Sequence, residues 1–307
     1  MASITRETVT AIIVAIISCF LFLLLATWRY QERIAFQPQG PPYPDPGDTR
    51  RIDYKAGDGQ NLFAYIAGNP DTAPGLVITF HGNADVAAAW IPWAHEVVRR
   101  TGAAVMLAEY RGYMGLDNRP TYETIALDGQ AALRVALDTL GTSPDRIAYY
   151  GHSLGSAVAA ELAVEHRPRA LLLEAPFTSA QDMAAVIAGR WLTSGLWRLV
   201  SRLHFDTVRI VASLDTPVSV IHGGRDRVIP SRMGKTVYDA AKNKREWLLI
   251  PAASHSDVEE VGGEDYWKWF TKALSPLALS RSKVWAMLDM GTQRILRGST
   301  ETGKRRN

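Results

Sequence analysis

Short hydrophobic runs alternate with longer helical patterns along most of this chain. The runs are rich in Val, Ile, Leu and aromatic residues and are bounded by Gly, Pro, Asp or Asn, which is typical of buried β-strands. They predict strands at residues 51–56, 62–67, 76–80, 104–108, 146–150, 170–174, 217–221 and 247–250. Helices are expected between them, at residues 86–100, 122–140, 154–166, 231–241 and 264–273. Such alternation is typical of an α/β fold, with a mostly parallel sheet flanked by helices.

An apolar segment precedes this alternation. Residues 9–28 contain no charged side chain and are dominated by Ile, Leu, Val, Ala and Phe. As a helix they would span about 30 Å, the thickness of the hydrocarbon core of a bilayer. Trp28 and Tyr30 follow at the position of an aromatic interface belt. The run is longer than the core of a signal peptide and no small-residue cleavage site follows it, so residues 1–30 predict an uncleaved, single-pass anchor.

Basic residues near the anchor bear on its orientation. Arg6 lies on one side of the apolar segment, and a larger basic group lies on the other. That group consists of Arg29, Arg33, Arg50, Arg51 and Lys55. Positive charge is in excess on the cytoplasmic side of membrane proteins, so the folded domain is expected to be cytoplasmic.

Proline content and helical patterning mark the remaining boundaries. Residues 31–50 are rich in proline and predict a stiff, extended linker. Residues 51–275 carry the strand–helix alternation and predict one domain. Within it, residues 181–204 combine Trp, Leu and Ile with Arg and predict a helical cap. The cap is either an apolar lid that leans on an anionic membrane or an ordinary helix pair on the sheet edge. Residues 276–307 predict a further helix and a basic tail.

Composition excludes several classes of function. The net charge of +3 is too small to suggest a nucleic-acid partner. The single cysteine, Cys19, leaves no internal disulfide to form. The chain has no phosphate-binding G-x-x-x-x-G-K-[ST] loop, no H-E-x-x-H and no paired C-x-x-C, so we expect neither a cofactor nor a metal.

A G-x-S-x-G pentapeptide joins one predicted inner strand to the helix that follows it. It consists of Gly151, His152, Ser153, Leu154 and Gly155. A strand, a tight turn and a helix in this order form the context of a nucleophile elbow, where glycines let a strained backbone pass close to its neighbours. The pattern predicts that Ser153 presents a nucleophilic hydroxyl at the top of the sheet.

A nucleophilic serine requires a general base. The histidines downstream of Ser153 are His166, His204, His222 and His255. His255 follows the last predicted strand, which is the loop expected to carry the base when the chain order is serine, acid, histidine. His166 is carried away from the serine by the intervening helix, so His255 is the predicted base.

The orienting acid is predicted by the same argument. Asp226 follows the strand at 217–221 through a glycine turn. Asp215 precedes that strand, at the wrong end of the sheet, and Asp257 is too close to His255 to reach back to its ring. Asp226 is therefore expected to fix the tautomer of the histidine and to stabilise its imidazolium form.

An oxyanion hole needs two backbone N–H groups aimed at the developing negative charge. The amide of Leu154, directly after the serine, is expected to supply one. The loop that follows the strand at 76–80 is expected to supply the other. Asn83 is the predicted donor there, with Ala84 as the alternative if the turn is shifted by one residue.

With these residues placed, the chain resembles the α/β-hydrolase fold superfamily. Within it, the chain is similar to membrane-anchored serine hydrolases that carry HGN, YRGY and GHSLG in this order. These motifs begin here at His81, Tyr110 and Gly151. Glu109 departs from the pattern, since the family more often has Asp before Tyr-Arg-Gly. The resemblance implies an esterase or thioesterase that acts through an acyl-enzyme on a lipid-like or acylated small molecule.

Two other functions remain open at this point. A serine peptidase would use the same triad and would need a carboxylate or arginine clamp for a peptide terminus. A non-catalytic scaffold at a membrane would keep the fold but need not keep the residues of the triad. The order of Ser153, Asp226 and His255 favours an enzyme.

Overall fold

The computed structural model describes residues 5–189 and 200–275. Part of the predicted cap, residues 190–199, therefore lies outside the described residues. The predicted C-terminal helix and basic tail, residues 276–307, lie outside them as well.

The centre of the domain is a sheet with the strand order β1-β2-β4-β3-β5-β6-β7-β8. Its first two pairings, β1 with β2 and β2 with β4, are antiparallel, and the pairings from β4 to β8 are parallel. The strands are β1 (Arg50–Lys55), β2 (Asn61–Ala67), β3 (Leu76–Phe80), β4 (Ala104–Ala108), β5 (Ile147–His152), β6 (Ala170–Glu174), β7 (Val218–Gly223) and β8 (Lys244–Ile250). The predicted α/β class with a mostly parallel sheet is confirmed, and each predicted strand has a counterpart.

Helices connect the strands. They are α1 (Arg6–Ala35), η1 (Ala87–Trp90), α2 (Ile91–Thr101), α3 (Tyr122–Arg134), η2 (Val135–Thr139), η3 (Pro144–Arg146), α4 (Leu154–Glu165), α5 (Ala180–Ala188), α8 (Thr207–Ser213) and α9 (Ser231–Ala240). Residues 258–275 are also helical. The helix predicted at 86–100 is divided into η1 and α2, with Pro92 in the first turn of α2, where its missing N–H costs no helical hydrogen bond.

Both faces of the sheet are buried. Helices α3, α4, α8 and α9 pack against one face, around Ile78 and Phe80 of β3. Helix α2 and residues 258–275 pack against the other face, around Val77. Strands β3 to β6 are buried along their whole length, as expected of a parallel sheet covered on both sides.

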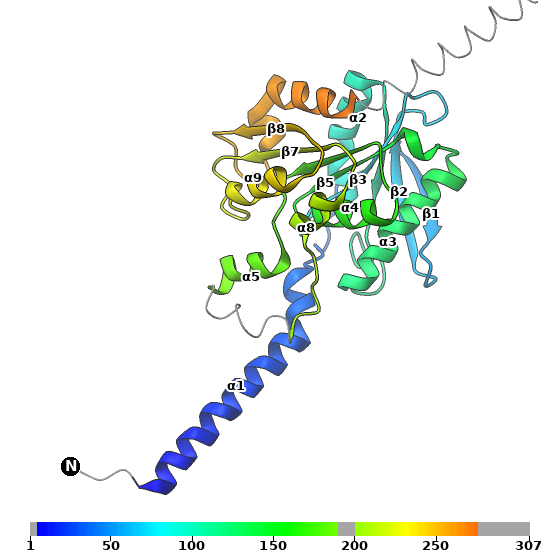
Figure 1. The fold of residues 1–307 in the computed structure, drawn as a ribbon. Helices are drawn as coiled ribbons and strands as arrows, with labels where there is room; N and C mark the ends of the chain where they lie inside the picture. Colours follow the sequence, from blue (N-terminus) through cyan, green and yellow to red (C-terminus); the bar gives the residue numbers. More distant parts are fainter. Residues whose placement is uncertain (1–4, 190–199, 276–307) are drawn as a thin grey trace, which may run out of the picture.

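Helix α1 projects from the edge of the domain (Figure 1). It has an 18-residue window of mean hydropathy 3.0, none of it buried in the protein, and is long and apolar enough to cross a membrane. The helix extends beyond the apolar segment and ends at Ala35, so the first residues of the predicted linker are helical. The reason is tertiary contact, because Gln31 and Glu32 are buried against the domain.

Candidate functional site

The turn between β5 and α4 holds Ser153 in a strained conformation. Its φ of 53° and ψ of −115° are rare for a residue with a side chain. The flanking glycines explain how the turn fits, because a Cβ on Gly151 would lie 2.2 Å from the carbonyl oxygen of Gly155. A Cβ on Gly155 would lie 2.0 Å from the carbonyl oxygen of Phe80. The Ser153 N–H donates to the Glu174 carbonyl at 2.9 Å, which ties the turn to β6.

Three predicted residues form one hydrogen-bonded chain. Ser153 Oγ lies 3.0 Å from His255 Nε2, and His255 Nδ1 lies 2.7 Å from Asp226 Oδ2. The three side chains come from loops that follow β5, β7 and β8, at the carboxyl edge of the parallel strands. The fold thus brings Ser153 into contact with His255, which lies 102 positions later in the sequence.

Asp226 is held as an anion. Its side chain is fully buried, and its Oδ1 accepts hydrogen bonds from the backbone N–H groups of Val228 and Ile229, both at 2.8 Å. Burial alone would raise the pKa of Asp226, but hydrogen bonds from His222 and His255 outweigh it and hold the pKa well below its ordinary value. The carboxylate can therefore accept a hydrogen bond from the Nδ1–H group of His255 across the neutral pH range.

His222 is a partner of Asp226 that the sequence reasoning missed. It is fully buried at the end of β7, and its Nε2 lies 3.2 Å from Asp226 Oδ2 and 2.9 Å from the carbonyl oxygen of Ile229. Because both neighbours are acceptors, Nε2 carries the proton and donates to them. The spacing of four residues between His222 and Asp226 is the signal in the sequence that indicates this contact.

His152, the first variable residue of the pentapeptide, contacts the loop that carries His255. Its Nε2 lies 3.1 Å from the carbonyl oxygen of His255, and the two rings lie 5.0 Å apart. Burial lowers the pKa of His152, so the ring is neutral and donates from Nε2. This contact fixes the backbone of the loop that carries His255.

The loop after β3 passes against the serine turn. A Cβ on Gly82 would lie 3.3 Å from Ser153 Cβ and 2.8 Å from His152 Nδ1, so a side chain would not fit there. Asn83 follows, and its side chain is turned toward the end of α1, where it contacts Ala35 and Gln37. Ala84 has a φ of 53°, which is again unusual for a residue with a Cβ.

A buried ion pair lies beneath this loop. His81 Nε2 lies 2.7 Å from Glu109 Oε1, and His81 Nδ1 lies 2.8 Å from the carbonyl oxygen of Gly82. Burial alone would lower the pKa of His81, but the Glu109 carboxylate reverses this and raises it. Glu109 also accepts the backbone N–H groups of Ala87 and Tyr110. Glu109, noted above as a departure from the family pattern, thus joins β4 to both ends of the loop.

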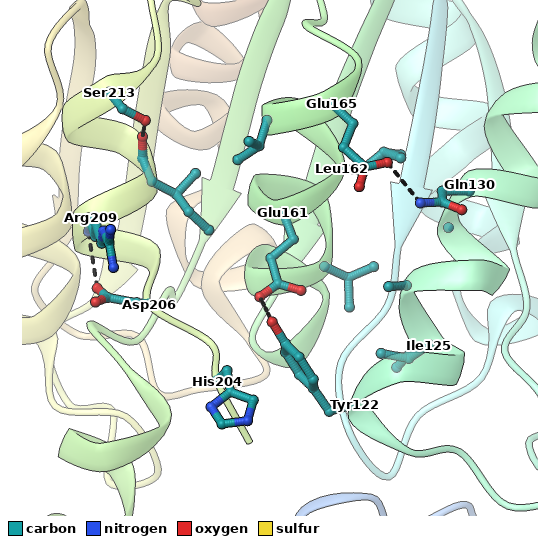
Figure 2. A pocket seen from close by; sticks show the side chains of 15 residues that line it. Tyr122, Ile125, Gln130, Glu161, Leu162, Glu165, His204, Asp206, Arg209 and Ser213 are labelled. Atoms are coloured by element: carbon teal, nitrogen blue, oxygen red, sulfur yellow. Dashed lines mark hydrogen bonds between the residues drawn. The ribbon is translucent and has the colours of Figure 1, made fainter. Parts of the chain in front are cut away.

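A separate cavity of about 590 Å³ lies between α3, α4 and α8. Glu161 and Tyr122 point toward each other in it (Figure 2), and the Tyr122 hydroxyl donates a hydrogen bond of 2.8 Å to Glu161 Oε1. Burial raises the pKa of Glu161 to about 7. None of Ser153, Asp226 and His255 lines this cavity. Across residues 5–189 and 200–275, no three His, Cys, Asp or Glu side chains are grouped so that they could hold a metal ion.

No model of a known protein family matches the chain. It is 32% identical over 249 residues to the uncharacterized protein Rv2307c of Mycobacterium tuberculosis, which covers 78% of this chain and 86% of that protein. It is 28% identical over 278 residues to the alpha/beta hydrolase domain-containing protein WAV2 of Arabidopsis thaliana, covering 83% and 90%.

Solved structures share the fold at low sequence identity. The esterase Pf2001 of Pyrococcus furiosus superposes with a TM-score of 0.64 at 18% identity, over 78% of this chain and 97% of the esterase. The esterase RhEst1 of a Rhodococcus species superposes with a TM-score of 0.53 at 15% identity, over 72% and 99%. Together with the sheet order and the relatives, these similarities identify the chain as a member of the α/β-hydrolase superfamily, in one family with Rv2307c.

Proposed function

We propose that this protein is a serine hydrolase that cleaves a carboxylic ester or thioester of a lipid-like substrate. The observation that carries the proposal is the unbroken hydrogen-bonded chain from Asp226 through His255 to the strained Ser153. A serine with a histidine and a buried carboxylate in this order is the arrangement that activates a hydroxyl for acyl transfer.

In the proposed reaction, Ser153 Oγ attacks the acyl carbonyl carbon while His255 Nε2 takes its proton, and Asp226 stabilises the imidazolium that forms. The tetrahedral intermediate collapses to an acyl-serine, and His255 returns the proton to the departing alcohol or thiol. Water then attacks the acyl-serine with His255 again as base. The products are the carboxylic acid and free Ser153.

The oxyanion would be held by two backbone amides. Leu154 is the first residue of α4, so its N–H has no carbonyl one turn earlier in the helix to donate to. Asn83 lies in the loop that packs against the serine turn, and its amide is the second donor, with Ala84 as the alternative. Each such donor contributes roughly a hundredfold or more to the rate.

The surroundings favour an amphiphilic substrate drawn from a membrane. The end of α1 contacts the loop after β3, which packs against the serine turn. Apolar side chains are exposed in segments that follow the carboxyl ends of β6 and β7, with Ile187 on α5 74% exposed and Val228, two residues after Asp226, 54% exposed. We propose that α1 anchors the protein in a membrane with the domain on the cytoplasmic side, where it meets the acyl groups of membrane-bound esters.

A fluorophosphonate probe tests the proposal. It should label the full-length protein in detergent, and it should label neither Ser153→Ala nor His255→Ala. A series of acetyl to decanoyl esters, the matching thioesters and short peptides then ranks the substrate classes, with the longer acyl esters expected to turn over faster. If the folded wild-type protein stayed unlabelled in several detergents, the scaffold function would replace the enzyme.

A further inference from the structure

The last turn of α1 is fastened to the domain by polar contacts. Gln31 Nε2 donates to the carbonyl oxygen of Val200 at 2.8 Å, and Gln31 Oε1 accepts the N–H of Arg202 at 2.7 Å. Glu32 pairs with the Arg202 side chain and accepts the N–H of Tyr122. The domain therefore contacts the helix directly, and not only a linker that follows it.

The chain beyond the helix stays on the domain. Phe36, directly after the last residue of α1, is 2% exposed and belongs to the core on the α3–α4 face of the sheet. Three residues later, the side-chain amide of Gln39 donates to the carbonyl oxygen of Ala84. The segment from Ala35 to Gln39 thus lies along the loop that follows β3.

Asn83 joins the two segments through every polar atom of its side chain. Its Nδ2 donates to the carbonyl oxygen of Ala35 at 2.8 Å, while its Oδ1 accepts the N–H of Gln37 at 2.8 Å and the hydroxyl of Tyr113 at 2.9 Å. The last carbonyls of a helix have no partner within the helix, and Asn83 supplies one from outside. The side chain therefore caps the anchor, and the preceding residue, Gly82, packs against Ser153.

The position of this loop governs the proposed reaction. An oxyanion donor is effective only within about 2.7–3.1 Å of the developing charge, and a misplacement of about 1 Å can lower the rate roughly a hundredfold. The loop adopts a strained backbone at Ala84, so contacts outside the loop must hold it in place. Of the contacts that reach Asn83 and Ala84 from outside, those from Ala35, Gln37 and Gln39 belong to the end of the anchor.

We propose that the end of α1 and the segment to Gln39 position the oxyanion loop through the side chain of Asn83 and the carbonyl of Ala84, so that the anchor contributes to the geometry of the active site. This inference rests on the proposed serine hydrolase function. It makes the Asn83 side chain a positioning group, distinct from the amide of the same residue. It also means that a disturbance of the anchor at its domain end alters turnover without any change in the triad.

The first test compares two exposed glutamines in the same segment. Gln39→Ala removes the contact with Ala84, whereas Gln37→Ala removes only a side-chain bond back to the carbonyl of Ile34. With full-length protein and a soluble p-nitrophenyl ester, Gln39→Ala should lower kcat about fivefold with KM unchanged, as expected for loss of one hydrogen bond. Gln37→Ala should match the wild type. Equal kcat for both variants would overturn the inference.

The second test acts on Asn83 itself. Asn83→Ala keeps the backbone amide and should lower kcat roughly 10- to 100-fold with little change in KM. Tyr113→Phe removes one contact to the side chain and should have a smaller effect in the same direction. Asn243→Ala is the matched control, because it also removes an asparagine bond to a backbone carbonyl, but at the opposite edge of the sheet.

The outcomes separate this inference from the proposed function. If the wild-type protein and the Asn83→Ala variant react equally fast with the fluorophosphonate, the inference is rejected and the hydrolase function is retained. An unreactive wild-type protein would reject the hydrolase itself. If Asn83→Ala failed to fold, the comparison of Gln39→Ala with Gln37→Ala would decide, since both side chains are exposed.

Discussion

Asp226 beside His255 and Glu161 in the cavity between α3, α4 and α8 are both carboxyl groups within the protein, yet their pKa values move in opposite directions. Burial raises both. Asp226 receives two backbone N–H groups and two histidines, and its pKa falls well below the ordinary value. Glu161 receives only the hydroxyl of Tyr122, and its pKa rises to about 7. The donors aimed at each carboxyl and the charges beside it, Glu165 next to Glu161 and His255 next to Asp226, thus set the opposite directions of the two pKa shifts.

The largest expected effect comes from replacing each carboxyl by an amide. Asp226→Asn should lower kcat/KM about 10⁴-fold, because the amide holds His255 in the wrong tautomer. Glu161→Gln is the matched control, since it makes the same change in a cavity that excludes the triad, and should keep wild-type activity. Ester hydrolysis by the two purified variants checks this, and comparable losses in both would break the contrast between the two sites.

A third carboxylate, Glu109, differs from Asp226 and Glu161 because it pairs with His81, a buried group that is itself charged. Glu109→Gln leaves His81 without its counter-charge and should lower the free energy of unfolding by about 3 kcal/mol. Urea unfolding of the full-length protein measures the change. Glu96→Gln, which affects an ion pair with Arg99 and Arg100 on the surface of α2, should leave the urea midpoint almost unaltered. A stable Glu109→Gln variant would argue that the pair is not an ion pair.

A substitution of His222 tests whether activity and stability depend on hydrogen-bond donors to Asp226 other than His255. His222→Phe keeps a ring of similar shape but removes the N–H shared by Asp226 and Ile229. The free energy of unfolding should fall by about 2 kcal/mol and kcat about tenfold, because a buried carbonyl loses its donor and a carboxylate loses one of its partners. Steady-state kinetics and urea unfolding measure both, and wild-type values would show that the two backbone amides suffice.

The smallest expected effect concerns pH and Glu161. The folded pKa of about 7 lies above the ordinary value of 4.5, so this group favours the folded state below pH 4.5 and loses that contribution as the pH rises through 7. Glu161→Gln should therefore raise the unfolding free energy by about 1 kcal/mol at pH 8, after allowance for solvent screening, and change it little at pH 4. Asp226 has the opposite sign: its depressed pKa contributes stability above its unfolded value, lost as the pH falls toward the folded one. Melting temperatures at the two pH values check the first statement, and equal shifts would contradict it.

Sequence patterns predicted the sheet because each strand is marked locally. The β5 strand, the pentapeptide and α4 are consecutive in the chain, so their order alone indicated the elbow at Ser153. His255 and Asp226 could be placed because loops after parallel strands gather at one edge of the sheet. Each of these inferences needed only the chain order and the period of the elements.

What escaped prediction depends on side-chain direction. The spacing of four residues brings His222 close to Asp226 in the chain, but it does not show that Nε2 turns toward the carboxylate. Nor does the sequence show that Asn83 turns its side-chain amide toward Ala35. The extension of α1 to Ala35 also escaped prediction, because it is stabilised by burial of Gln31 and Glu32 against parts of the domain that are distant in sequence. The cavity beside Glu161 also arises only when α3, α4 and α8 are assembled.

For the proposed membrane-anchored hydrolase, the length of α1 has a consequence for where the enzyme finds its substrates. Its apolar residues account for about 30 Å, and the turns from Arg29 to Ala35 add about 10 Å, somewhat more than the roughly 5–8 Å of headgroups on one side of a bilayer. In the proposed membrane arrangement, the domain holds the helix just outside the bilayer, so α1 would act as a rigid connection of fixed length and not as a flexible tether. Such a protein would search for esters by lateral diffusion in two dimensions, and the density of substrate in the leaflet would set its rate.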